Sequence, residues 1–230
     1  MNGTLENIYF ENVNKTSDST NSGIIGYSNQ YAQFNNVHAK NVSIVVPVER
    51  TADSLYVGGL IGYSYYSKVT NCSITDVNVV SEAEITDVNA GGLIGYSNAA
   101  SYSNVFAQDV NVVVRKAINT QGVGGLIGRE VSSVGTIYNA YSTGYVENNG
   151  YRTGGLVGYT EGYIENSYSS TQVISDIDTL GGIVGYSVNR TYISNNQDSN
   201  LDIFQSTIHR KIPVSEVCQL LCNRKHPILV

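Results

Sequence analysis

The stretch Gly58-Gly59-Leu60-Ile61-Gly62-Tyr63 decides the fold, because related copies of it recur along the chain. Each of the six copies places two large aliphatic residues between glycines, and five of them end in tyrosine. The lead glycines stand 36, 33, 33, 30 and 27 residues apart, and a period of this size is typical of solenoids and other stacked arrays. The copies span residues 23–27, 59–63, 92–96, 125–129, 155–159 and 182–186.

A second motif, centred on asparagine, follows each lead glycine by 11 to 14 residues. Stacked coils would align these asparagines in one column, where each amide can bond to the next. Asparagine also tolerates the left-handed backbone that tight corners require. The segments 42–46, 77–80 and 110–114, rich in β-branched residues, predict strands. The column asparagines are expected to be Asn35, Asn71, Asn104, Asn139, Asn166 and Asn195.

These signals together predict an all-β fold. With no helical period between short strands, each unit fits one coil of a β-solenoid, or β-helix, and residues 1–203 would form about six or seven coils. The glycines of the block leave room for a neighbouring segment or a bend. We expect the block to be a strand that buries both aliphatic residues, one on each face.

The composition argues against some classes of function. Charged residues make up 14% of the chain, against about 25% in a typical soluble domain, and the net charge is −6. This charge argues against nucleic-acid binding. There is no apolar run of about 18 residues, and therefore no predicted transmembrane helix. No signal peptide is visible, and residues 3–7 already resemble the repeated segment 135–139. The chain is therefore expected to be a monomer or a part of a longer protein.

The block and its asparagine motif resemble the GLUG motif of bacterial and protist surface and secreted proteins. The resemblance covers residues 1–203 and implies an extracellular or cell-surface module, acting in adhesion or as a spacer, with a glycan or a cell-surface protein as partner. It implies no enzymatic activity and no cofactor. Arg129 replaces the tyrosine in one block and is expected to interrupt the tyrosine column.

The tyrosines of the block are the candidate binding site. In a solenoid they form one column, and an exposed aromatic column would bind sugar rings or an apolar partner. A buried column would only be core packing, and we favour packing. The candidates are Tyr27, Tyr63, Tyr96, Tyr159 and Tyr186.

The alternative is a polysaccharide-active β-helix enzyme, which would need a pair of carboxylates. Three of the candidate aspartates precede a Val-Asn pair, so they look like a repeated turn former and not like one half of a unique site. The leading prediction is therefore non-enzymatic. The candidates are Asp76, Asp87, Asp109, Asp176 and Asp178.

The tail from residue 204 to residue 230 differs in composition, with four basic residues and one acidic residue. Apolar residues recur with helical period over 214–223, which fits a short capping helix; a disordered or foreign extension and a docking segment are the alternatives. Cys72 is expected to be an inward-facing free thiol. A zinc site would have to use the tail, and apolar packing of its cysteines is favoured over metal binding. Its ligands would be Cys218, Cys222, His226 and His209.

Overall fold

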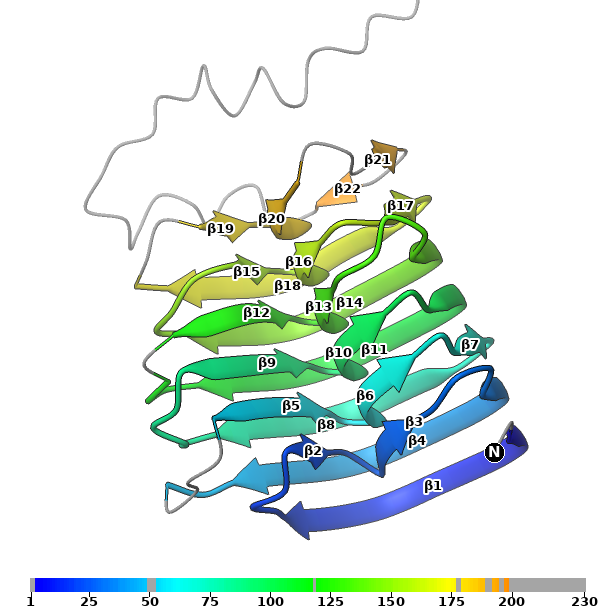
Figure 1. The fold of residues 1–230 in the computed structure, drawn as a ribbon, viewed down its shortest axis with the longest axis horizontal. Helices are drawn as coiled ribbons and strands as arrows, with labels where there is room; N and C mark the ends of the chain where they lie inside the picture. Colours follow the sequence, from blue (N-terminus) through cyan, green and yellow to red (C-terminus); the bar gives the residue numbers. More distant parts are fainter. Residues whose placement is uncertain are drawn as a thin grey trace, which may run out of the picture.

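The computed structural model describes residues 3–48, 53–117, 119–176, 179–188, 192–194 and 197–198. Across these ranges the chain is all-β, without a helix, and winds into a stack of parallel strands (Figure 1). One ten-stranded sheet and two six-stranded sheets run along the stack. The predicted β-solenoid is confirmed. The expected capping helix and the boundary at residue 204 lie outside the described residues.

The first sheet carries the long strands of the coils. Its members pair in parallel, and Val42, Val77 and Val110 lie in one column. All three valines are buried on the core side of the sheet, and Gly144 takes their place in the next coil. The strands are β1 (Thr4–Thr16), β4 (Gln33–Val46), β7 (Lys68–Thr70), β8 (Ser73–Ser81), β11 (Ser101–Val114), β14 (Thr136–Asn148), β17 (Tyr163–Glu165), β18 (Tyr168–Ser175), β21 (Tyr192–Ser194) and β22 (Gln197–Asp198).

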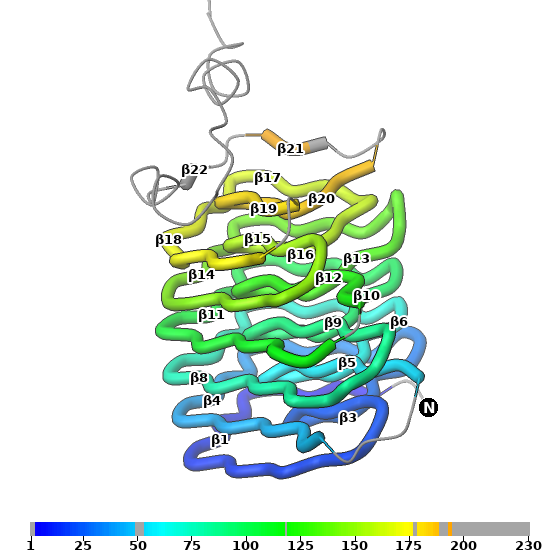
Figure 2. Tube along the Cα trace, turned by 90° about the vertical axis from the view of Figure 1, so that its left-hand side faces the viewer, coloured from blue at the N-terminus to red at the C-terminus, as the bar shows by residue number. Residues whose placement is uncertain are grey.

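The second and third sheets close the coil, as the tube drawn along the Cα trace shows (Figure 2). Each coil contributes one short strand to each of these two sheets. The second sheet contains β2 (Asn21–Ser22), β5 (Ser54–Gly58), β9 (Asp87–Gly91), β12 (Thr120–Gly124), β15 (Thr153–Gly154) and β19 (Leu180–Gly181). The third contains β3 (Ile25–Ser28), β6 (Ile61–Tyr65), β10 (Ile94–Asn98), β13 (Ile127–Glu130), β16 (Val157–Thr160) and β20 (Val184–Ser187).

The repeated block forms the corner between these two sheets. Gly58 ends β5, and Ile61 begins β6 after a bend. The expectation that the block is one strand is therefore wrong, whereas the predicted burial of both Leu60 and Ile61 is confirmed. The corner needs glycine because the sheets approach closely: a Cβ built on Gly95 would lie 2.5 Å from the backbone nitrogen of Val57.

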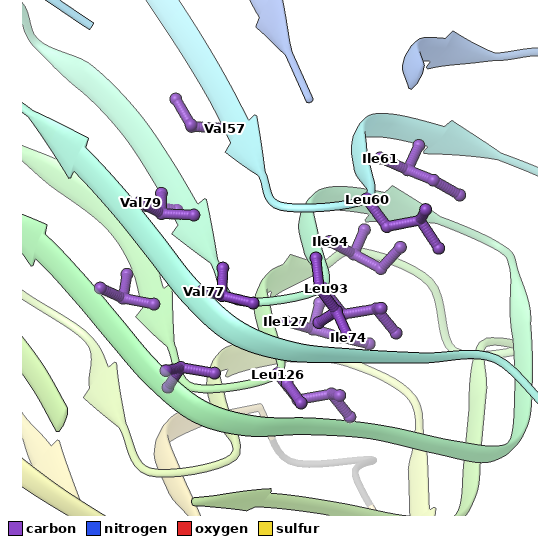
Figure 3. Packing of buried hydrophobic residues seen from close by; sticks show 14 of the residues in the cluster. Val57, Leu60, Ile61, Ile74, Val77, Val79, Leu93, Ile94, Leu126 and Ile127 are labelled. Carbon is purple, nitrogen blue, oxygen red and sulfur yellow. The ribbon is translucent and has the colours of Figure 1, made fainter. Parts of the chain in front are cut away.

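The core consists of aliphatic columns inside the coils. Leu60, Leu93 and Leu126 come from successive corners and are fully buried beside the valines of the first sheet (Figure 3). Cys72 is buried as a free thiol, as predicted, and its Sγ lies 3.2 Å from the carbonyl oxygen of Thr70. Burial raises the pKa of this thiol.

The asparagine column bends the long strands. Its members have φ between 49° and 56°, the left-handed region that was expected. Adjacent amides bond along the stack, with Nδ2 of Asn104 donating to Oδ1 of Asn71 at 3.0 Å. The first two coils use Asn7 and Asn36; the assignment of Asn35 was wrong, since that residue pairs with Thr70, and Asn195 lies outside the described residues. The column is Asn7, Asn36, Asn71, Asn104, Asn139 and Asn166.

Candidate functional site

The tyrosines of the block lie in register on the third sheet. One residue from each of its six strands belongs to the column, and the pairing of β10 with β13 places Arg129 next to Tyr96. We call this column the tyrosine–arginine ladder. It consists of Tyr27, Tyr63, Tyr96, Arg129, Tyr159 and Tyr186.

The rings of the ladder pack against one another. The centroids of Tyr63 and Tyr96 are 4.9 Å apart with an interplanar angle of 22°, and Tyr159 and Tyr186 are 5.7 Å apart at 7°. Inside the ladder, ring faces therefore contact neighbouring rings. The ends are more open, with Tyr27 49% exposed and Tyr186 43% exposed, whereas Tyr159 is only 7% exposed.

Arg129 does not interrupt the ladder, contrary to expectation. Its guanidinium carbon lies 4.9 Å from the ring centroid of Tyr159 and 5.8 Å from that of Tyr96. A planar guanidinium stacks on aromatic faces and is attracted by the ring quadrupole. Arg129 thus takes the place of a ring and adds a positive charge to the column.

A second row of side chains interleaves with the ladder, with Tyr56 from β5 of the second sheet and Arg152 from the position just before β15. Tyr56 has its ring centroid 5.3 Å from that of Tyr63 and 4.8 Å from that of Tyr96. The guanidinium carbon of Arg152 lies 5.0 Å from the ring centroid of Tyr159 and 5.2 Å from that of Tyr186. Neither residue was predicted from the sequence, although each stands seven positions before the ladder residue of its own coil.

A pocket of about 340 Å³ lies at the C-terminal end of the ladder. Arg152 and Tyr186 line it, together with polar side chains of the second sheet and its adjoining loops. This pocket brings a guanidinium, amides, hydroxyls and aromatic rings to one place. The lining residues are Asn119, Thr120, Gln121, Tyr151, Arg152, Thr179 and Tyr186.

The family comparison identifies the repeat. Residues 53–80 match the family model of the GLUG motif. The resemblance seen in the sequence is thereby confirmed for this range, which runs from β5 into β8 and so covers one coil. No curated protein and no solved structure matches the chain. With its repeated blocks and stacked coils, the chain has the architecture of a repeat module.

A second aromatic ladder lies on the first sheet. Phe106, Tyr141 and Tyr168 come from successive coils, with centroid separations of 4.8 and 5.0 Å and interplanar angles of 3° and 9°. This ladder was not predicted from the sequence. Its signal was present, because each residue follows its coil's column asparagine by two positions.

The candidate catalytic aspartates separate into different environments. Asp76 and Asp109 have φ of 54° and 52° on the first sheet, as expected of turn formers. Asp87 instead belongs to β9 and accepts a hydrogen bond from Oγ of Ser54 at 3.2 Å, so it is not part of that repeated feature. Asp176 is exposed, and Asp178 lies outside the described residues.

Within the described ranges, no three His, Cys, Asp or Glu side chains gather as a metal site would require, and no helix is long and apolar enough to cross a membrane. The tail residues considered as zinc ligands lie outside these ranges.

Glu130 is a buried carboxyl group that sequence analysis did not single out. It is buried in a column of the third sheet otherwise made of serine and threonine. The Ser97 hydroxyl donates to its Oε2, and the Ala99 N–H donates to its Oε1 at 3.2 Å. Burial raises the pKa of Glu130 to about 8. The sequence signal for this residue was a glutamate at the repeat position where the other blocks have serine or threonine.

The native protein should therefore lose stability as the pH rises from about 4.5 to 8. Between the ordinary pKa of 4.5 and the raised value of about 8, native Glu130 holds a proton that the unfolded chain releases. The free energy of unfolding should fall by up to about 1.4 kcal/mol per pH unit in this window. Urea unfolding at pH 5 and pH 8 measures this change. The Glu130→Gln variant should lose this contribution, and an identical pH dependence in both proteins would contradict the assignment.

Proposed function

We propose that this chain is a non-enzymatic repeat module, secreted or held at a cell surface, that adheres to glycans through the tyrosine–arginine ladder. The observation that carries the proposal is the ladder itself, which spans all six strands of the third sheet and has open rings at both ends. A polysaccharide lying along the solenoid axis would meet the same side chains coil after coil.

The chemistry of the ladder suits sugar hydroxyls. Tyrosine combines a rigid apolar ring with a polar hydroxyl, and its low side-chain entropy limits the free-energy cost of binding. A tyrosine hydroxyl, with an ordinary pKa near 10, stays protonated near neutral pH and can both donate and accept hydrogen bonds. Burial raises the pKa of Tyr159 further, to about 12. Because stacking covers ring faces inside the ladder, contacts there would use hydroxyl groups. At the open end, Tyr27 offers its ring to a sugar face.

The location and the lack of catalysis rest on separate arguments. The GLUG resemblance favours the secreted or surface fraction, where repeats of this type occur. The turn-forming roles of Asp76 and Asp109 favour a non-enzymatic module, since the backbone conformation explains why these carboxylate residues recur.

A glycan array tests the proposal with a matched pair of variants. The ladder variant carries Tyr27→Ser, Tyr63→Ser and Tyr96→Ser, and the control carries Phe106→Ser, Tyr141→Ser and Tyr168→Ser in the second ladder. We expect glycan binding by the wild type, a loss of at least about tenfold in the ladder variant, and retention in the control.

Circular dichroism must show the same β content in all three proteins. A spacer role alone would follow if the folded wild type retained no glycan on the array. Equal losses in the two variants would contradict a site on the tyrosine–arginine ladder.

A further inference from the structure

We propose that the pocket at the C-terminal end of the ladder binds a carboxylated saccharide, with Arg152 as the ligand of the sugar carboxylate. This inference rests on the proposed glycan-binding function and names the class of glycan. Three features support it: the charge of the site, the backbone conformation of Arg152 and the lining of the pocket.

Two positive charges lie close together here in a chain of net charge −6. The Gln121 Oε1 atom accepts hydrogen bonds from Nη1 of Arg152 at 2.8 Å and from Nη1 of Arg129 at 3.5 Å. Among the described residues neither arginine forms an ion pair, whereas Nη1 of Arg115 lies 2.8 Å from Oε1 of Glu82. Neighbouring guanidinium groups without a paired carboxylate attract an anion, and a planar carboxylate can accept two parallel N–H bonds from one of them.

Among the described residues, no carboxylate lies within ion-pairing distance of either arginine. The Glu161 carboxylate bonds instead to the Tyr159 hydroxyl, which donates to its Oε1 at 2.7 Å. The Nε atom of Arg129 is buried without a hydrogen-bond partner in the described structure. The site therefore keeps cationic hydrogen-bonding capacity beyond the single amide oxygen of Gln121.

Arg152 is held in an uncommon backbone conformation. Its φ is 61°, in the left-handed region that glycine and asparagine adopt more readily than arginine. The hydroxyl Oγ1 of Thr179 accepts a hydrogen bond from the Arg152 backbone N–H at 2.6 Å. Strain at a residue with a chemically active side chain is typical of binding sites, where the surrounding structure holds the conformation.

The remaining lining matches a sugar in kind and in size. The Asn119 amide and the Thr179 hydroxyl can hydrogen-bond sugar hydroxyls, whereas the buried Thr120 hydroxyl already donates to the Tyr151 carbonyl oxygen at 2.6 Å. The half-exposed rings of Tyr151 and Tyr186 can cover apolar sugar faces. A volume of about 340 Å³ lies at the small end of the range for ligand pockets. A short saccharide unit with one carboxylate at Arg152 fits this combination.

Titration calorimetry with tetragalacturonate and its fully methyl-esterified form tests the inference on the full chain. The two probes share the sugar backbone and differ in charge. The wild type should bind the acid at least about tenfold more tightly than the ester, and added salt should weaken the binding. The Arg152→Gly variant should lose this preference and remain folded, because glycine readily adopts the left-handed backbone.

Arg115→Ser is the matched control, since it removes a paired guanidinium elsewhere, and it should bind the acid as the wild type does. Equal binding of acid and ester, no binding of the acid by the wild type, or an unchanged acid preference in Arg152→Gly would overturn the inference. Suppose that one of these outcomes is found while the wild type still binds neutral glycans on the array through Tyr27, Tyr63 and Tyr96. Then the inference about the pocket fails and the proposed function stands. If no glycan binds at all, the proposed function fails with it.

Discussion

Replacing Leu93 by aspartate should abolish folding at room temperature. The side chain is fully buried between the corners of two neighbouring coils, whose backbones bond to its own: the Leu60 N–H donates to the Leu93 carbonyl at 3.0 Å, and the Leu93 N–H donates to the Leu126 carbonyl at 2.9 Å. Losing the leucine costs about 3–5 kcal/mol, and an unpaired buried carboxylate adds several more. This sum approaches the whole stability of a typical domain.

Two controls separate core disruption from a general sensitivity to change. Val134→Asp introduces the same charge at a position that is 64% exposed and should leave the melting temperature nearly unchanged. Deletion of residues 59–91 removes one whole coil and brings Gly92 behind Gly58, which preserves the corner. Since solenoid stability is roughly a sum over neighbouring coils, the deletion should be tolerated better than Leu93→Asp. Thermal melts that coincide for the deletion and Leu93→Asp would contradict a stacked core.

The second large effect is expected for Gly95→Val. A Cβ at this position would lie 2.5 Å from the backbone nitrogen of Val57 and 2.7 Å from its carbonyl carbon and oxygen. Backbone atoms cannot rotate away as a flexible side chain can, so the two sheets must separate at the corner. We expect a loss of about 3 kcal/mol or more. In a chain of this size that is a fall of about 6–12 °C in melting temperature, measurable by circular dichroism.

Gly3→Val is the matched control, because nothing lies within 4 Å of a Cβ built on Gly3. Its melting temperature should stay within about 2 °C of the wild type. If Gly95→Val had the same melting temperature as this control, the corner would not depend on the close approach of the sheets.

The candidate site could be predicted only in part. A repeated spacing shows which position of the coil a residue occupies, but it does not show which residues of the adjoining sheet contact it across the corner. The tyrosine column followed from the register of the blocks. The insertion of Arg129 between rings and the second row with Tyr56 and Arg152 did not follow, since they depend on how closely two sheets meet. The spacing of the glycines indicated that two segments could approach each other closely. It did not indicate which side chains this approach would bring together.

By itself, the sequence determined the repeat, the all-β class, the burial of the aliphatic pair and the left-handed asparagine column. These features arise from residue types that recur at a regular spacing, and one rule therefore applies to every coil. Only the tertiary structure decided that the block is a corner, that ring faces are largely covered, and that Arg152 and Tyr186 share a pocket. Those outcomes depend on distances between strands far apart in each coil, and such distances are set by packing and not by local preference.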